Sequence, residues 1–149
     1  MGGSSSKNSK TVSGITQNKS VENKTISVTG TNGSFMKDEN YKDAQSRVKY
    51  NYTFDGENNN SIIFDPKNEK VLKYITDRIN DYALSYNISN KLDKETTTGK
   101  NALTYTNQMK DRVKVMKEML EHHFGKTKVD KVVKEAVKNS EYLPDNIKF

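Results

Sequence analysis

The hydrophobic pattern is strongest between residues 103 and 138, where apolar residues recur with the period of a helix. At steps of 4, 4, 3, 4 and 4, six of them define one helical stripe: Tyr105, Met109, Val113, Met116, Leu120 and Phe124. Gly125 suits the positive φ that often ends a helix, and Thr127 suits the cap of the next one. That next helix has its own apolar set: Val129, Val132, Val133, Ala136 and Val137. The pattern predicts two helices joined at Gly125.

Alternation of apolar and polar residues predicts strands ahead of these helices. Residues 47–54 alternate strictly, and one face of this strand would be formed by Val48, Tyr50, Tyr52 and Phe54. Residues 61–64 predict a second strand, joined to the first by a connection longer than a tight turn. Residues 25–29 alternate in the same way and predict a short additional strand.

A further helix is expected between the strands and the helix pair. Asp65-Pro66 favours a helix start, because Asp caps free backbone N–H groups and Pro is tolerated at the first helical position. The helix should run to about residue 86 on a stripe of Val71, Ile75, Ile79, Tyr82 and Tyr86. Residues 88–100 are polar and predict a mobile loop. The expected fold is α+β, with a small antiparallel sheet of two or three strands packed by three helices.

Composition divides the chain into two parts. Only 32% of the residues are hydrophobic, and they are concentrated after residue 47, so burial would not offset the entropy of ordering the whole chain around one core. We expect an extended, flexible N-terminal arm over residues 1–46 and a small α+β domain over residues 47–149. Apolar residues in polar surroundings are candidate contacts with a partner protein: Phe35, Met36, Tyr142, Leu143, Ile147 and Phe149.

The net charge of +6 comes from the two ends of the chain. Residues 1–46 contain 6 basic and 4 acidic groups, and residues 99–149 contain 11 and 7. Only 3 of the 25 basic residues are Arg, whereas recognition of bases and phosphates favours the rigid Arg fork. A basic accessory protein that binds nucleic acid is therefore an alternative function, with candidate polyanion contacts at Lys128, Lys131, Lys134 and Lys138.

No motif predicts catalysis or a bound cofactor. His122 and His123 are adjacent and point about 100° apart on a helix, so they do not form the i, i+4 pair of a metal site, and a structural or solvated role is expected. Gly125-Lys126-Thr127 resembles the end of a phosphate-binding P-loop, but it follows a helix, and Leu120 occupies the position of the first Gly. The absence of cysteine excludes thiolate metal sites. We expect a non-enzymatic protein without catalytic, cofactor-binding or metal-ligating residues.

The first residues fit an N-myristoylation pattern, with Gly2 exposed after Met removal and Ser6 at the sixth position. One myristoyl chain binds a membrane only marginally, so nearby basic residues would have to supply a second signal. A membrane-associated adaptor acylated at Gly2 is the third function considered. The N-terminus lacks the apolar segment of a secretory signal, and no apolar run approaches the ~20 residues of a membrane span.

The order of the expected elements carries a resemblance to a known class of proteins. Strands are followed by a helix opening at Phe64-Asp65-Pro66, a loop, a long helix ending at His123-Phe124-Gly125 and a short helix of Lys and Val. This order, over residues 48–138, resembles that of small tail-assembly and virion proteins of bacteriophages. The resemblance implies a non-enzymatic structural or assembly component of a larger complex, in contact with other protein subunits and located in the virion or the host cytoplasm.

Overall fold

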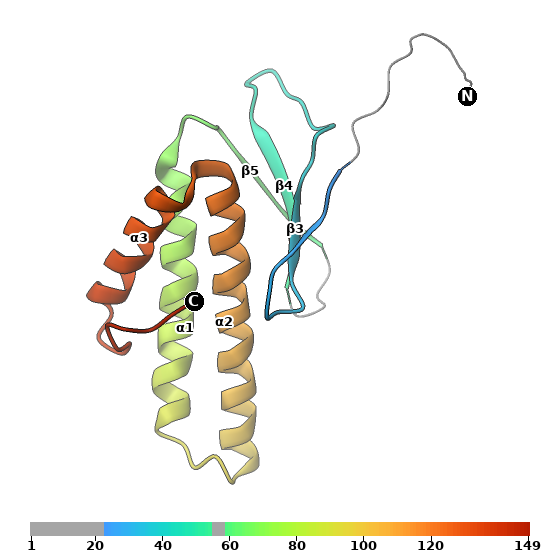
Figure 1. Cartoon of the computed structure of the whole chain (residues 1–149). Coiled ribbons are helices and arrows are strands. Elements are labelled where there is room, and N and C mark those ends of the chain that lie inside the picture. Colours follow the sequence, from blue (N-terminus) through green and yellow to red (C-terminus); the bar gives the residue numbers. More distant parts are fainter. Residues whose placement is uncertain (1–22, 55–58) are drawn as a thin grey trace, which may run out of the picture.

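A computed structural model describes residues 23–54 and 59–149 (Figure 1). The strands form one antiparallel sheet in the order β2-β3-β4-β5, with the bounds Ile26–Ser27, Ser34–Lys37, Val48–Thr53 and Asn60–Phe64. After the 3-10 turn η2 (Glu69–Leu72) come α1 (Lys73–Asn90), α2 (Thr97–Phe124) and α3 (Lys126–Asn139). The predicted α+β class is confirmed, but the sheet has four strands rather than two or three.

The additional strand lies in the segment expected to be part of the N-terminal arm. Phe35 and Met36 belong to β3, which is absent from the sequence prediction because its four residues are too few to show alternation. Phe35 pairs with Ile26 on one side and Tyr52 on the other, so β2 and β3 are continuous with the rest of the sheet. The domain therefore begins before residue 47. The expectations for residues 1–22, including acylation of Gly2, fall outside the described residues.

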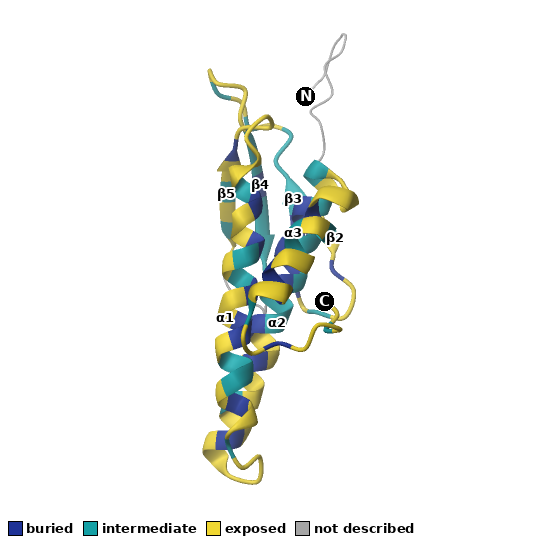
Figure 2. Ribbon diagram, turned by 90° about the vertical axis from the view of Figure 1, so that its left-hand side faces the viewer, coloured by how far each residue is buried: buried dark blue, intermediate teal, exposed yellow. Residues whose placement is uncertain are grey.

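All three helices lie on the same side of the sheet, which leaves its other face open (Figures 1 and 2). The covered face contributes buried aromatic side chains, among them Phe35, Tyr50 and Phe64. The rings of Tyr50 and Phe64 are stacked, with their centroids 5.5 Å apart. Val48, Tyr50, Tyr52 and Phe54 share one face, as their alternation predicts, and this face is the covered one, because Tyr50 and Phe54 are buried and the other two pack against the core.

The helices form a long hairpin with a third helix across one end. α1 and α2 pack against each other, and α3 packs against both (Figure 1). The loop that joins α1 to α2 is much shorter than the expected 88–100 segment, because Thr96 caps α2 by accepting a hydrogen bond from the Gly99 N–H at 3.0 Å. At the other end Gly125 has φ 91°, as predicted, but α3 begins directly after it and Thr127 is not its cap.

The chain comes into close contact with α2 at Gly33, just before β3. A Cβ atom at this position would overlap Cγ2 of Val115 on α2 and would lie 3.0 Å from the backbone oxygen of Thr53. Val115 is itself fully buried. The absence of a side chain at residue 33 thus allows the sheet and α2 to touch.

We expect Gly33→Ala to lower the free energy of unfolding by about 1–3 kcal/mol, because the added methyl group separates β3 from α2. Val115→Ala removes the opposing methyl groups, so the double variant should lose less stability than the sum of the two single variants. Urea unfolding of the wild type and the three variants measures this. Strictly additive losses would contradict the contact.

Candidate functional site

The candidate partner contacts divide into buried and accessible residues. Phe35 and Leu143 belong to the core of this chain, so they are not available to a partner in this fold. Ile147 and Phe149 also pack against the core, and the Phe149 ring lies 5.5 Å from that of Tyr82 on α1. The apolar C-terminal segment therefore docks on its own helices (Figure 1). Tyr142 is exposed, and Met36 is half-buried on the open face of the sheet.

The four lysines proposed as polyanion contacts are all exposed on one side of α3. They lie opposite the buried Val129 and Ala136, so α3 is sharply divided into an apolar and a basic side. Lys128 forms an ion pair with Glu69 of η2, and Glu135 lies among the lysines in the helical period. The strongest positive charge on α3 is therefore provided by Lys131, Lys134 and Lys138.

The two histidines lie at the C-terminal end of α2, and their rings pack against aromatic side chains of the sheet. The His122 ring lies 5.8 Å from that of Phe35, and the His123 ring lies 4.7 Å from that of Phe64. Nδ1 of His123 and the hydroxyl of Tyr50 are 3.3 Å apart. Burial, followed by the charges of Lys37 and His122, lowers the pKa of His123, and burial raises the pKa of Tyr50 to about 12. These contacts give the histidines a packing role.

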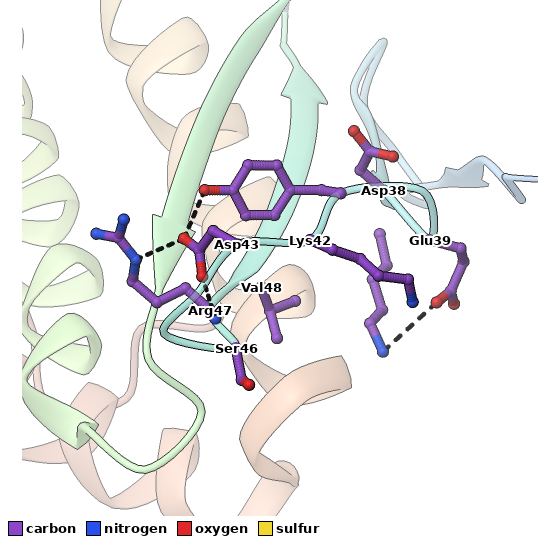
Figure 3. A pocket seen from close by; sticks show the side chains of 9 residues that line it. Asp38, Glu39, Lys42, Asp43, Ser46, Arg47 and Val48 are labelled. Atoms are coloured by element: carbon purple, nitrogen blue, oxygen red, sulfur yellow. Dashed lines mark hydrogen bonds and ion pairs between the residues drawn. The ribbon is translucent and has the colours of Figure 1, made fainter.

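A polar pocket of about 280 Å³ lies at the loop between β3 and β4 (Figure 3). Its central group is Asp43, whose two carboxylate oxygens accept four hydrogen bonds of 2.8–3.0 Å. The donors are the N–H groups of Gln45 and Arg47, the hydroxyl of Tyr41 and Nε of Arg47. The backbone N–H of Arg47 contributes most to lowering the pKa of Asp43 to about 2, and the bond to Asp43 raises the pKa of Tyr41. A carboxylate held by four donors fixes the loop and is a poor proton acceptor at neutral pH.

Metal ligands do not gather anywhere in the described part of the chain. Within residues 23–54 and 59–149, no three side chains of the His, Asp or Glu type lie close enough to hold a metal ion. In the same residues, no helix has both the length and the apolar character needed to cross a membrane.

Five of the seven large apolar residues that are exposed among the described residues lie on α1 and α2: Tyr74, Leu84, Ile88, Leu103 and Tyr105. Five exposed residues of α1 follow one another at steps of 3, 4, 3 and 4, on the side of α1 away from its buried residues: Tyr74, Asp77, Asp81, Leu84 and Ile88. We call this set the outer stripe of α1. Leu84 and Ile88 are each 54% exposed. The outer stripe is absent from the sequence prediction because the stronger buried stripe of the same helix determines its hydrophobic pattern.

Tyr105 of α2 is also exposed, although its spacing predicts burial. Its exposed fraction is 53%, and the N-terminal half of α2, to which it belongs, extends beyond the sheet (Figures 1 and 2). Leu103, in the same half of α2, is also exposed. The far half of the hairpin is a two-helix structure with uncovered apolar residues.

No protein-family model, curated protein or solved structure matches the chain.

The low pKa of Asp43 predicts how stability depends on pH. Because the pKa in the folded state, about 2, lies below the unfolded value of about 3.9, Asp43 stabilises the fold above about pH 4. This contribution is lost as the pH falls from about 4 towards 2. An NMR titration of the Asp43 carboxyl carbon should have its midpoint near 2, and Tyr41→Phe, which removes one donor, should raise that midpoint. A wild-type midpoint near the unfolded value would contradict the observed hydrogen bonds.

Proposed function

We propose that the chain is a non-enzymatic structural or assembly component of a larger protein complex. The observation that carries this proposal is the far half of the α1–α2 hairpin, where Leu84, Ile88 and Tyr105 are each more than half exposed. Leu84 and Ile88 are neighbours on one face of α1, and exposed apolar patches are typical of protein–protein contacts. The contacted subunits are other proteins, and the hairpin is the element that reaches them.

A phage virion or tail is the assembly that we propose. The support for it is the order of the elements, in which strands are followed by a helix, a long helix and a short Lys/Val helix, as in the small phage proteins that the sequence resembles. The open face of the sheet gives the chain a second surface for neighbours in such an assembly, besides the projecting hairpin (Figure 1).

Gel filtration of an extract from the native source tests the assembly role. The wild-type chain should elute in a complex well above its own mass of 17.0 kDa. Leu84→Glu combined with Ile88→Glu should shift it to the monomer volume, because two carboxylates cannot be buried unpaired in an apolar contact.

The matched control places the same two charges elsewhere on the hairpin. Thr104 and Gln108 are exposed on α2 with the same spacing of four residues, so Thr104→Glu with Gln108→Glu should leave the complex intact. Elution of the wild-type chain as a monomer would contradict the proposal.

The basic side of α3 favours nucleic-acid binding as the second candidate function. Under this candidate, the affinity for a short DNA duplex should fall steeply between about 50 and about 200 mM salt. Changing Lys131, Lys134 and Lys138 together to Glu should abolish binding, because each Lys displaces counterions from a phosphate. Fluorescence anisotropy measures both effects.

Three exposed lysines on other surfaces, Lys67, Lys91 and Lys100, provide the control with an equal change in net charge. Equal losses in the two triple variants would mean that binding depends on net charge and not on α3. Absence of binding by the wild type at low salt would exclude this candidate.

A further inference from the structure

β5 forms an open edge of the sheet. It is the last strand in the order β2-β3-β4-β5, and no other strand of the described residues lies along its far side. The N–H of Asp38 donates to the carbonyl oxygen of Lys49 at 2.8 Å, so Lys49 directs its backbone groups towards β3. In an antiparallel sheet this direction alternates, which turns the backbone groups of Tyr50 and its partner Ile62 towards each other. The N–H and C=O groups of Ser61 and Ile63 therefore point to the open edge.

This edge lacks the features that usually prevent a strand from pairing with another chain. Exposed edges in natural proteins are commonly very short or carry Lys, Pro or a bulge. β5 has five residues, Asn60–Phe64, none of them charged and none of them Pro, and its pairing with β4 is regular throughout. The opposite edge, β2, has only two residues. An unprotected edge of this length is suited to accept an additional strand.

A groove of about 370 Å³ runs beside this edge, between β5 and α1. Ile62 and Tyr52 of the sheet and Tyr74 of α1 supply its apolar and aromatic walls. The α1 side also carries two carboxylates, Asp77 and Asp81, and one guanidinium, that of Arg78. Arg78 and Asp81 are 4.0 Å apart, and no cation of the described residues pairs with Asp77.

The groove is thus acidic in a chain whose net charge is +6. Side chains of an added strand alternate between the two faces of the sheet, so every second one would enter the groove. A long cationic side chain there would place its alkyl stem against Tyr74 and its charge beside Asp77.

We propose that β5 accepts an extended segment of a partner protein as a fifth strand, with a Lys or Arg side chain of that segment in the groove beside Asp77 and Asp81. This proposal rests on the proposed assembly function and names one place where a partner binds. The groove adjoins the outer stripe of α1, since Tyr74, Asp77 and Asp81 belong to both.

A second copy of the same edge fits this groove less well. Antiparallel pairing of two β5 strands would place both α1 helices on the same side of one continuous sheet, and the two acidic grooves would face each other. β5 itself has no basic residue to offer. The charges therefore favour a basic segment over a β5–β5 dimer.

Selection from a random heptapeptide library displayed on phage, with the full chain as the target, tests the proposal. The enriched peptides should contain a Lys or Arg, be rich in β-branched residues and lack Pro at their centre. The strongest peptide is then synthesised in two forms, one unmodified and one with N-methyl groups on alternate residues. The N-methylated form, which cannot form all the strand hydrogen bonds, should bind at least about tenfold more weakly.

Variants of the chain distinguish the contribution of the β5 edge to peptide binding from the contribution of the groove. Ser61→Pro removes a backbone donor that points away from β4 and is tolerated at an edge, so it should weaken peptide binding about tenfold, whereas Ser61→Ala should not. Asp77→Asn with Asp81→Asn should also weaken binding about tenfold and reduce its dependence on salt. Asp130→Asn with Glu135→Gln, which removes two charges from α3, should leave binding unchanged.

Several results would overturn the proposal. They are the absence of any enriched peptide, enriched peptides without a cationic residue, and equal binding of the N-methylated peptide. If one of these occurs while the native complex still depends on Leu84 and Ile88, the edge proposal fails and the assembly function stands. If peptides bind as expected but the chain elutes as a monomer from its native source, the edge is a peptide site and the assembly function fails.

Discussion

The C-terminal half of α2 is packed between two layers, and the positions of the other elements follow from this packing. Val115 and Met119 face the sheet side, Val113 and Leu120 lie on a different part of the helix circumference, and all four are completely buried. Full burial of such a side chain contributes about 1.5–3 kcal/mol to the free energy of folding, relative to leaving it exposed. The same helix therefore holds the sheet on one side and α1 and α3 on the other. At Gly33, the absence of a side chain lets the backbone beside β3 contact Val115 of α2.

Periodicity in the sequence was sufficient to predict three helices and three of the four strands, although α1 begins at Lys73 rather than at Asp65-Pro66 and ends at Asn90 rather than near residue 86. The stripe through Met109, Val113, Met116 and Leu120 is buried as expected, and Gly125 has the positive φ that its position predicts. The strand β3 could not be predicted in this way, because Phe35 and Met36 point to opposite faces and one buried residue shows no alternation. The burial of Val115 was also unexpected, since it results from contact with a strand more than 75 residues earlier in the chain.

The surfaces proposed for binding were harder to predict than the core. Leu84 and Ile88 have the same spacing as core residues, but they lie on the side of α1 away from its buried residues and are each more than half exposed. Conversely, Leu143 and Phe149 have the composition of a contact segment but meet the chain's own helices. Whether an apolar residue is covered depends on the lengths and directions of other elements, which local spacing does not contain.

The hairpin also sets a fixed distance within any complex that it enters. α2 has 28 residues, which at about 1.5 Å per residue corresponds to a rigid rod of about 42 Å. A molecule held at the tip and another held at the sheet would be kept apart by the hydrogen-bonded, packed helices rather than by a flexible tether. Evolution could change that spacing only by adding or removing matched whole turns in both helices, because an unmatched insertion would rotate the side chains of one helix away from those of the other.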